Sequence, residues 1–170
     1  MSYDIEVQID DEFEHEINSQ ALEQVAELTL RACQIEHGSF TIVVTDDEQV
    51  RTLNREFRAV DATTDVLSFP NEEGEDESVP QLALPAELED ENEQYLGDII
   101  IAYPYSMAQA KRYGNSPLAE LRLLTVHGVL HLLGFDHATP EEEQEMWQLQ
   151  SQILQNFGDP IDLSQRVYDE

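Results

Sequence analysis

The apolar residues at the start of the chain follow two different periods, which predict a strand and then a helix. In IEVQI, residues 5–9, every second residue is apolar, as is typical of a half-buried strand. The apolar residues of LEQVAELTLRACQIEH then recur at helical spacing. We therefore expect a helix that Asn18 or Ser19 caps and that Gly38 ends. The segment FTIVV, directly after it, predicts a second strand.

The middle of the chain continues with one short helix and two further strands. Thr45 and Glu48 have the spacing of a capping box, which predicts that a helix through LNREF begins there. DVLSF and LGDIIIAY predict the third and fourth strands, and the apolar density of the latter suits the centre of a sheet. Pro104 is expected to end the fourth strand.

Helices predominate in the C-terminal part of the chain. SMAQAKRYG predicts one helix, Ser116 and Pro117 begin a second and strongly apolar one, and Thr139 and Pro140 begin the last. No internal repeat and no second domain is indicated. We predict a single α+β domain over residues 1–170, with a small mixed four-stranded sheet packed with about five helices.

The charge of the chain is strongly unbalanced, with 37 acidic and 8 basic side chains and a formal net charge of −29. Residues 71–93 contain ten acidic residues and no basic one, which predicts a flexible, solvated loop. Such a balance repels polyanions at long range. A face that binds anions is therefore expected only where basic residues cluster, and six of the eight lie in two segments: Arg51, Arg55 and Arg58, and Lys111, Arg112 and Arg122.

The sequence also bears on the compartment of the protein. Cys33 is the single cysteine, so an internal disulfide is excluded. The first residues lack the basic and apolar regions of a signal peptide, and no apolar run is long enough to span a membrane. We expect a cytoplasmic protein that has no contact with membranes.

The segment HGVLHLLGFDH, residues 127–137, carries the spacing of a metal site. His127 and His131 are four residues apart and share one face of a helix. Gly134 is suited to end that helix in a left-handed conformation, which would bring His137 back toward the other two rings. Three neutral imidazoles leave a fourth position open on the cation, as in catalytic zinc sites.

One residue of this motif separates it from the similar motif of the metzincin proteases. Those enzymes have a glutamate directly after the first histidine as general base, whereas this chain has Gly128. Phosphodiester cleavage depends less on that carboxylate, because a cation and an arginine can neutralise the charge that develops on the phosphoryl oxygens. Both water and the 2′-hydroxyl of RNA remain open as the nucleophile.

HGVLHLLGFDH, together with LNREFR, TTDVLSFP and LGDIII in this order, resembles the YbeY family of bacterial endoribonucleases, the rRNA maturation factors. The resemblance implies one zinc ion per chain at His127, His131 and His137, and Arg58 as the partner of the substrate phosphate. Arg58 and His127 are therefore the expected catalytic residues. It also implies cleavage of single-stranded RNA, 3′-end maturation of small-subunit ribosomal RNA, and ribosome quality control, with the small ribosomal subunit and its assembly factors as partners.

Two other functions remain open from the residues alone. One is a metal-dependent peptide or amide hydrolase, which the missing glutamate disfavours. The other is a ribosome-assembly factor without catalysis, whose metal only fixes the last helices.

Three side chains near these motifs also have open roles. Arg58 could instead be a surface arginine that pairs with Glu56 or Asp61. Asp136 could orient an imidazole or cap the turn. For Asp98 we expect a buried hydrogen bond with a structural role.

Overall fold

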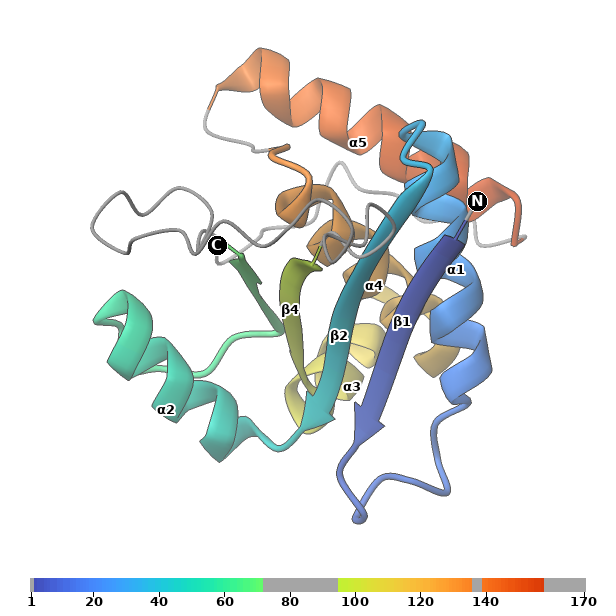
Figure 1. The fold of residues 1–170 in the computed structure, drawn as a ribbon. Coiled ribbons are helices and arrows are strands. Elements are labelled where there is room, and N and C mark those ends of the chain that lie inside the picture. Colours follow the sequence, from blue (N-terminus) through green and yellow to red (C-terminus); the bar gives the residue numbers. More distant parts are fainter. Residues whose placement is uncertain (1, 72–94, 136–138, 158–170) are drawn as a thin grey trace, which may run out of the picture.

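The computed structural model describes residues 2–71, 95–135 and 139–157, which form one mixed sheet and the helices around it (Figure 1). The acidic segment 71–93, apart from its first residue, lies outside the described residues. The elements are, in chain order, β1 (Ser2–Ile9), α1 (Ser19–Ala32), β2 (His37–Thr45), α2 (Asp47–Arg58), β3 (Val66–Pro70), β4 (Tyr95–Ala102), α3 (Tyr103–Tyr113), α4 (Pro117–Leu132) and α5 (Pro140–Gln155).

The four strands lie in the order β1-β2-β4-β3. β1, β2 and β4 are parallel, whereas β3 runs antiparallel to β4 at the edge of the sheet. The predicted α+β class, with a mixed four-stranded sheet and five helices, is confirmed for the described residues. β2 and β4 are the central strands, as the apolar density of β4 indicated.

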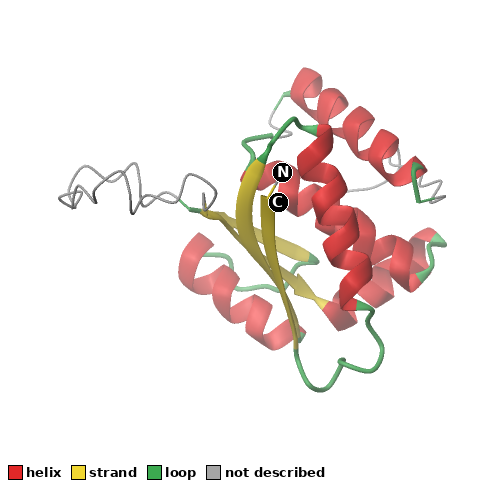
Figure 2. Ribbon diagram, turned by 45° about the vertical axis from the view of Figure 1, so that its right-hand side comes forward, coloured by secondary structure: helices red, strands yellow, loops and turns green. Residues whose placement is uncertain are grey.

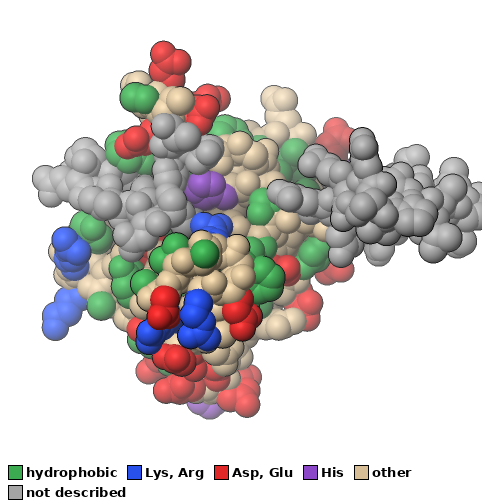
Figure 3. Space-filling model, turned by 90° about the vertical axis from the view of Figure 1, so that its left-hand side faces the viewer, with side chains coloured by type: hydrophobic (Ala, Val, Ile, Leu, Met, Phe, Trp, Pro, Cys, Tyr) green, Lys and Arg blue, Asp and Glu red, His purple; other side chains and the backbone are tan. Residues whose placement is uncertain are grey.

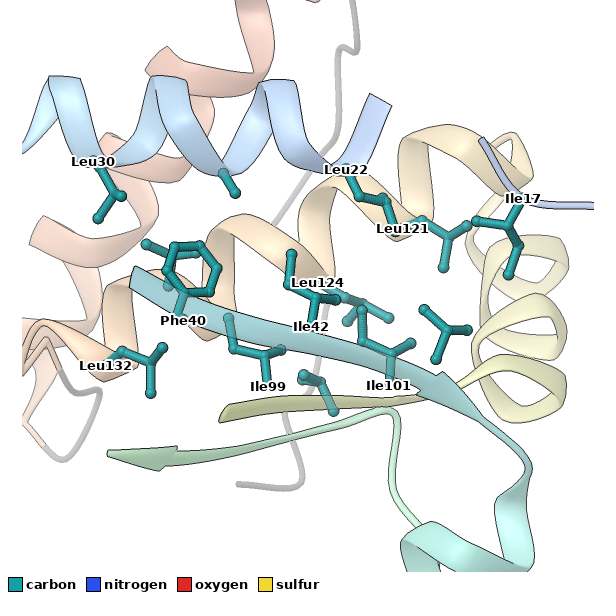
Figure 4. Packing of buried hydrophobic residues seen from close by; sticks show 14 of the residues in the cluster. Ile17, Leu22, Leu30, Phe40, Ile42, Ile99, Ile101, Leu121, Leu124 and Leu132 are labelled. Carbon is teal, nitrogen blue, oxygen red and sulfur yellow. The ribbon is translucent and has the colours of Figure 1, made fainter. Parts of the chain in front are cut away.

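The two faces of the sheet are covered differently. α2 packs on one face, and α1 and α4 pack on the other, with α5 outside them (Figure 2). The side chains of β4 point alternately to the two faces of the sheet. Ile99 and Ile101 belong to the main core below α1 and α4, while Ile100 belongs to a smaller cluster below α2. In the main core these residues meet Phe40 of β2 and Leu124 of α4 (Figure 4).

α4 is the central helix of the molecule and is buried on almost every side. Its buried residues run from Ala119 to Leu132 and include Leu123 and Val126, which face a second cluster with Met146 of α5. A helix that is apolar all round has to be enclosed by other elements. The two histidines of α4 therefore lie on the helix that is most enclosed by other elements. None of the described helices is long and apolar enough to cross a membrane.

The prediction that α1 continues to Gly38 is wrong. The helix ends at Ala32, because the chain reverses at Gln34, which has a left-handed φ of 61°. Two hydrogen bonds close the turn, from the Gln34 amide to the Arg31 carbonyl at 3.0 Å and from the Ile35 amide to the Leu30 carbonyl at 3.0 Å. This is the Schellman pattern. Residue 38 lies within β2.

The predicted capping box of α2 is also wrong. Thr45 is the last residue of β2, and Asp46 caps the helix by accepting a hydrogen bond from the Gln49 amide at 2.8 Å. The carboxylate of Asp46 stands next to the free amides of the first turn, so the threonine is not needed there. The other predicted caps are confirmed, namely Asn18 of α1, Ser116 of α4 and Thr139 of α5.

Candidate metal centre and phosphate site

The side chains of His127 and His131 face each other at the end of α4. Their Nε2 atoms are 3.0 Å apart, and the ring centroids are separated by 4.4 Å at an interplanar angle of 78°. His127 is fully buried and His131 is half-buried. The spacing of four residues thus places two imidazole nitrogens at one point, as the sequence predicts.

The chain reverses directly after this pair of histidines. Gly134 has a left-handed φ of 98°, a conformation that side chains with a Cβ rarely adopt. Its amide donates to the His131 carbonyl at 3.1 Å, and the Phe135 amide donates to the Leu130 carbonyl at 3.0 Å. These bonds form a Schellman motif, so the predicted left-handed helix end at the glycine is confirmed. Residues 136–138 lie outside the described residues, and the assignments of Asp136 and His137 stay predictions.

The other ring nitrogen of His127 has a partner on α5. His127 Nδ1 lies 3.0 Å from Oε1 of Gln150, which is also fully buried. An amide oxygen can only accept a hydrogen bond. With the amide in this orientation, a neutral His127 would carry its ring proton on Nδ1 and direct the lone pair of Nε2 at His131.

The two described histidines fit two adjacent positions around a zinc ion. Tetrahedral zinc with nitrogen ligands at about 2.0–2.1 Å holds neighbouring ligand atoms about 3.3 Å apart, close to the 3.0 Å between the Nε2 atoms. Within residues 2–71, 95–135 and 139–157, no group of three or more histidine, cysteine or acidic side chains is placed to hold a metal. A complete site therefore needs a ligand from outside these ranges, and position 137 is the predicted one.

Gly128, the residue where metzincins have their catalytic glutamate, packs against the sheet. A Cβ atom built on this glycine would lie 2.8 Å from Cγ2 of Ile99, a fully buried residue of β4. Real Cβ atoms do not approach other carbons so closely. The position has no room for a glutamate, so the departure from the protease motif has a packing reason.

Arg58 is the last residue of α2, and its backbone is fixed by the turn that follows. Ala59 ends the helix with a left-handed φ of 59°, and the Val60 amide donates to the Asn54 carbonyl at 3.2 Å. The buried side chain of Asn54 holds the next stretch by donating to the Ala62 carbonyl at 2.8 Å. The turn therefore directs Arg58 toward β3.

Ser68 of β3 connects the Arg58 guanidinium to α4, the helix that carries the two histidines. Nη2 of Arg58 donates to the Ser68 carbonyl at 3.0 Å, and the guanidinium lies over the Phe69 ring, 5.7 Å from its centroid. Ser68 Oγ in turn donates to the carbonyl of Gly128, the neighbour of His127, at 3.3 Å. On one face of the molecule a histidine and a basic side chain are visible next to one another (Figure 3).

The other two arginines of α2 have a different partner. Arg51 Nε donates to Asp61 at 2.9 Å, and Arg55 lies 3.9 Å from the same carboxylate. The hydrogen bond from Arg51, followed by its charge, lowers the pKa of Asp61. Asp61 is thus engaged by Arg51 and Arg55, whereas Arg58 donates to a backbone carbonyl.

The second basic segment does not share the surroundings of Arg58. Lys111 and Arg112 lie in the last turn of α3, where Arg112 packs over the ring of Tyr113 at 5.5 Å. The guanidinium of Arg122, on α4, lies over the ring of Phe157 at 4.8 Å. These contacts give no reason to place a phosphate at this segment.

The hydrogen bond expected for Asp98 is present, but the prediction that it is buried is wrong. It is half-buried on the face of the sheet opposite α4, because its neighbours Gly97 and Ile99 face that helix. It accepts a hydrogen bond from the Tyr95 hydroxyl. Partial burial and then this carboxylate raise the pKa of Tyr95. Asp98 also lines a hollow with Phe57 and other residues below α2.

The comparison with protein families identifies the family of this chain. The family model described as Endoribonuclease YbeY matches residues 4–158, nearly all of the described structure. The chain belongs to this family.

Several members of the YbeY family are close enough to align over most of their length. The chain is 46% identical over 122 residues to Endoribonuclease YbeY of Brevibacillus brevis, covering 71% of this chain and 76% of that protein. It is 40% identical to Endoribonuclease YbeY of Chloroflexus aggregans, covering 94% of this chain and 99% of that protein. The solution structure of TM1509 from Thermotoga maritima shares the fold, with a TM-score of 0.55 at 20% identity and 91% of each chain covered.

Two side chains of the candidate site were not found from the sequence. Ser68 lies inside the segment TDVLSFP, and its link between Arg58 and α4 depends on β3 lying at the sheet edge. Gln150, by contrast, could have been recognised from the sequence. It interrupts the apolar stripe of α5, whose buried residues are Met146, Gln150, Ile153 and Leu154. A polar residue in such a stripe has to find a hydrogen-bond partner inside the protein.

Proposed function

We propose that this chain is a zinc-dependent endoribonuclease that cleaves single-stranded RNA, with one zinc ion per chain held by His127, His131 and His137. We further propose that it acts in the cytoplasm, in 3′-end maturation of small-subunit ribosomal RNA and in ribosome quality control. Membership of the endoribonuclease YbeY family supports the reaction. The observation that carries the proposal is the junction of the paired histidines with Arg58 through Ser68.

The metal site and the arginine have separate tasks in this proposal. A bound zinc ion would polarise a phosphoryl oxygen and make water a stronger acid. His127 and His131 would hold the ion through Nε2, and the buried α4 would keep the two rings in place. Burial of His127 would also keep solvent away from one side of the ion.

Arg58 would bind and orient the phosphate. Its guanidinium offers a planar set of donors that matches phosphate oxygens, and it is held beside β3 by the hydrogen bond to the Ser68 carbonyl. Its positive charge would stabilise negative charge on the phosphoryl oxygens as the phosphodiester bond breaks. In a chain with a formal charge of −29, such a group is needed to hold RNA near the metal.

The two other functions make different demands on the same residues. A peptidase of the metzincin type needs a carboxylate at position 128, where the contact with Ile99 leaves no room for a side chain. An assembly factor without catalysis would need the metal for folding only. Such a factor would not need the contact between Arg58 and β3, the strand that Ser68 links to the helix of the two histidines.

A direct assay separates the three functions. The purified protein would be incubated with a single-stranded RNA that carries the 3′ end of the small-subunit precursor, with the same RNA as a duplex, and with casein, each with and without a chelator. We expect cleavage of the single strand, which the chelator stops and added zinc restores, and no cleavage of casein. Casein hydrolysis, or RNA cleavage that survives the chelator, would contradict the proposal.

A further inference from the structure

Gln150 lies in the apolar interface between α5 and α4. It is fully buried, and the other buried residues of its helix, Met146, Ile153 and Leu154, belong to the cluster that α4 and α5 form together. Burying an amide among such residues is unfavourable unless it makes hydrogen bonds. The contact that it makes is the one with His127, between Oε1 and Nδ1 at 3.0 Å.

This contact determines which nitrogen of His127 carries the proton. A neutral imidazole has one N–H donor and one nitrogen with a free lone pair. Since Oε1 of Gln150 only accepts, the proton is on Nδ1 and the lone pair is on Nε2, 3.0 Å from Nε2 of His131. A metal ligand needs this tautomer, because only an unprotonated nitrogen binds a cation.

The other end of the Gln150 amide is expected to lower the stability of the folded protein. Nε2 of Gln150 is buried and has no hydrogen-bond partner among the residues that the structure describes. An apolar side chain of the same shape would avoid this unsatisfied donor. If the amide turned over, Nε2 would donate to His127 Nδ1, and the ring proton would then have to sit on the nitrogen that faces His131.

We propose that Gln150 is a positioning residue for the metal centre, which holds neutral His127 in the Nδ1–H tautomer and aims its Nε2 at the shared binding point. This inference rests on the proposed metal site and adds to it a residue from another helix. It also couples α5 to the site, because the packing of α5 on α4 sets the position of the Gln150 amide.

Two substitutions at position 150 and one control test this role. Gln150→Met keeps the shape and removes the acceptor, while Gln150→Glu keeps an acceptor. Gln148→Met is the matched control, since Gln148 lies on the exposed side of the same helix. The tautomer of each histidine would be read from long-range ¹H–¹⁵N NMR spectra of the metal-free proteins at about pH 8, where a histidine of ordinary pKa is neutral. Zinc affinity would be measured by competition with a chelating dye, and thermal stability by melting.

We expect Gln150→Met to lose the pure Nδ1–H tautomer of His127 and to bind zinc about 10- to 100-fold more weakly. Its melting temperature should stay near that of the wild type, because the substitution removes the unsatisfied Nε2 donor of Gln150 but leaves Nδ1 of the buried His127 without its partner. Gln150→Glu should restore both the tautomer and the affinity, and Gln148→Met should match the wild type. An unchanged His127 tautomer in Gln150→Met would overturn the proposal. So would an affinity that falls only in parallel with melting temperature in both variants at position 150. The tautomer is read without metal or RNA, so a failure of the ribonuclease assay is a separate result that contradicts the proposed function alone.

Discussion

The ends of α2 and α4 supply the two parts of the proposed centre, and they hold their side chains in opposite ways. α4 is enclosed on nearly all sides, and His127 at its end is fully buried with a partner on each ring nitrogen. α2 buries only Val50 and Asn54, and Arg58 at its end is exposed. A metal ligand needs a fixed ring, whereas a phosphate-binding group has to be reached by a large substrate.

This difference separates the consequences of substitution. Changes at the end of α4 should affect metal content, and they should affect stability as well where the side chain is buried. Changes at the end of α2 should affect the handling of RNA and leave metal and fold as they are. Ser68, which contacts both ends, joins two parts that are otherwise independent.

The largest effect is expected for His127→Ala. Removing this ring takes away one metal ligand and leaves Oε1 of Gln150 buried without its partner, which costs about 1–3 kcal/mol. We expect zinc content near zero, no cleavage of RNA, and a lower melting temperature. His131→Ala, at a half-buried position, should lose zinc and activity with a smaller loss of stability. Elemental analysis and thermal melting measure these effects, and full zinc content in His127→Ala would remove that residue from the site.

The second largest effect is expected for Arg58→Glu. The substitution replaces the phosphate-binding donors with a negative charge, so RNA cleavage should fall to background while zinc content and melting temperature stay near those of the wild type. Arg51→Glu makes the same change of charge on the same helix, at a residue that pairs with Asp61, and should lose much less activity. Equal losses in the two variants would show that only the overall charge of α2 matters.

A smaller effect, on stability, is expected for Gly128→Ala. The new Cβ would press on Cγ2 of Ile99, and such overpacking costs about 1–3 kcal/mol. The better helix propensity of alanine offsets up to about 1 kcal/mol of this. Chemical denaturation should show a net loss, and Ile99→Ala in the same chain should reduce the additional loss caused by the alanine. A Gly128→Ala protein more stable than the wild type would contradict the packing explanation for the missing glutamate.

The smallest effect is expected for the ion pair of Arg51 and Asp61, in which both side chains are about half exposed. Arg51 lowers the pKa of Asp61 in the folded protein. The pair therefore contributes stability above the ordinary pKa of an aspartate, about 3.9, and loses it as the pH falls through the lowered folded value. The difference in melting temperature between wild type and Arg51→Gln should be small at neutral pH and should vanish in acid. A difference that grows in acid would contradict this pairing.

Two helix ends show how far the sequence determines the fold. Gly134 follows the end of α4 and Gln34 follows the end of α1, and both residues adopt the left-handed conformation of the same Schellman pattern. The glycine could be recognised because it adopts this conformation at little cost. The glutamine could not, since its left-handed φ results from the hydrogen bonds and packing of the folded chain, and α1 was therefore predicted to be too long.

The candidate site, too, could be predicted only in part from the sequence. The spacing of His127 and His131 follows from helix geometry alone, and it was predicted correctly. The contacts of Gln150 and Ser68 depend on how α5 and β3 pack on α4, which no local pattern describes. Asp98 was misjudged because an apolar strand was taken as buried on both faces, whereas α2 leaves it only half covered.

X-ray absorption at the zinc edge of the zinc-loaded protein would show whether histidine side chains of α4 and of the segment after it hold the metal. We expect three imidazole nitrogens at about 2.0–2.1 Å and one oxygen ligand, with no sulfur. In His137→Ala the number of imidazoles should fall to two. A spectrum with fewer than three imidazoles in the wild type, or with a sulfur ligand from Cys33, would contradict the proposed three-histidine site.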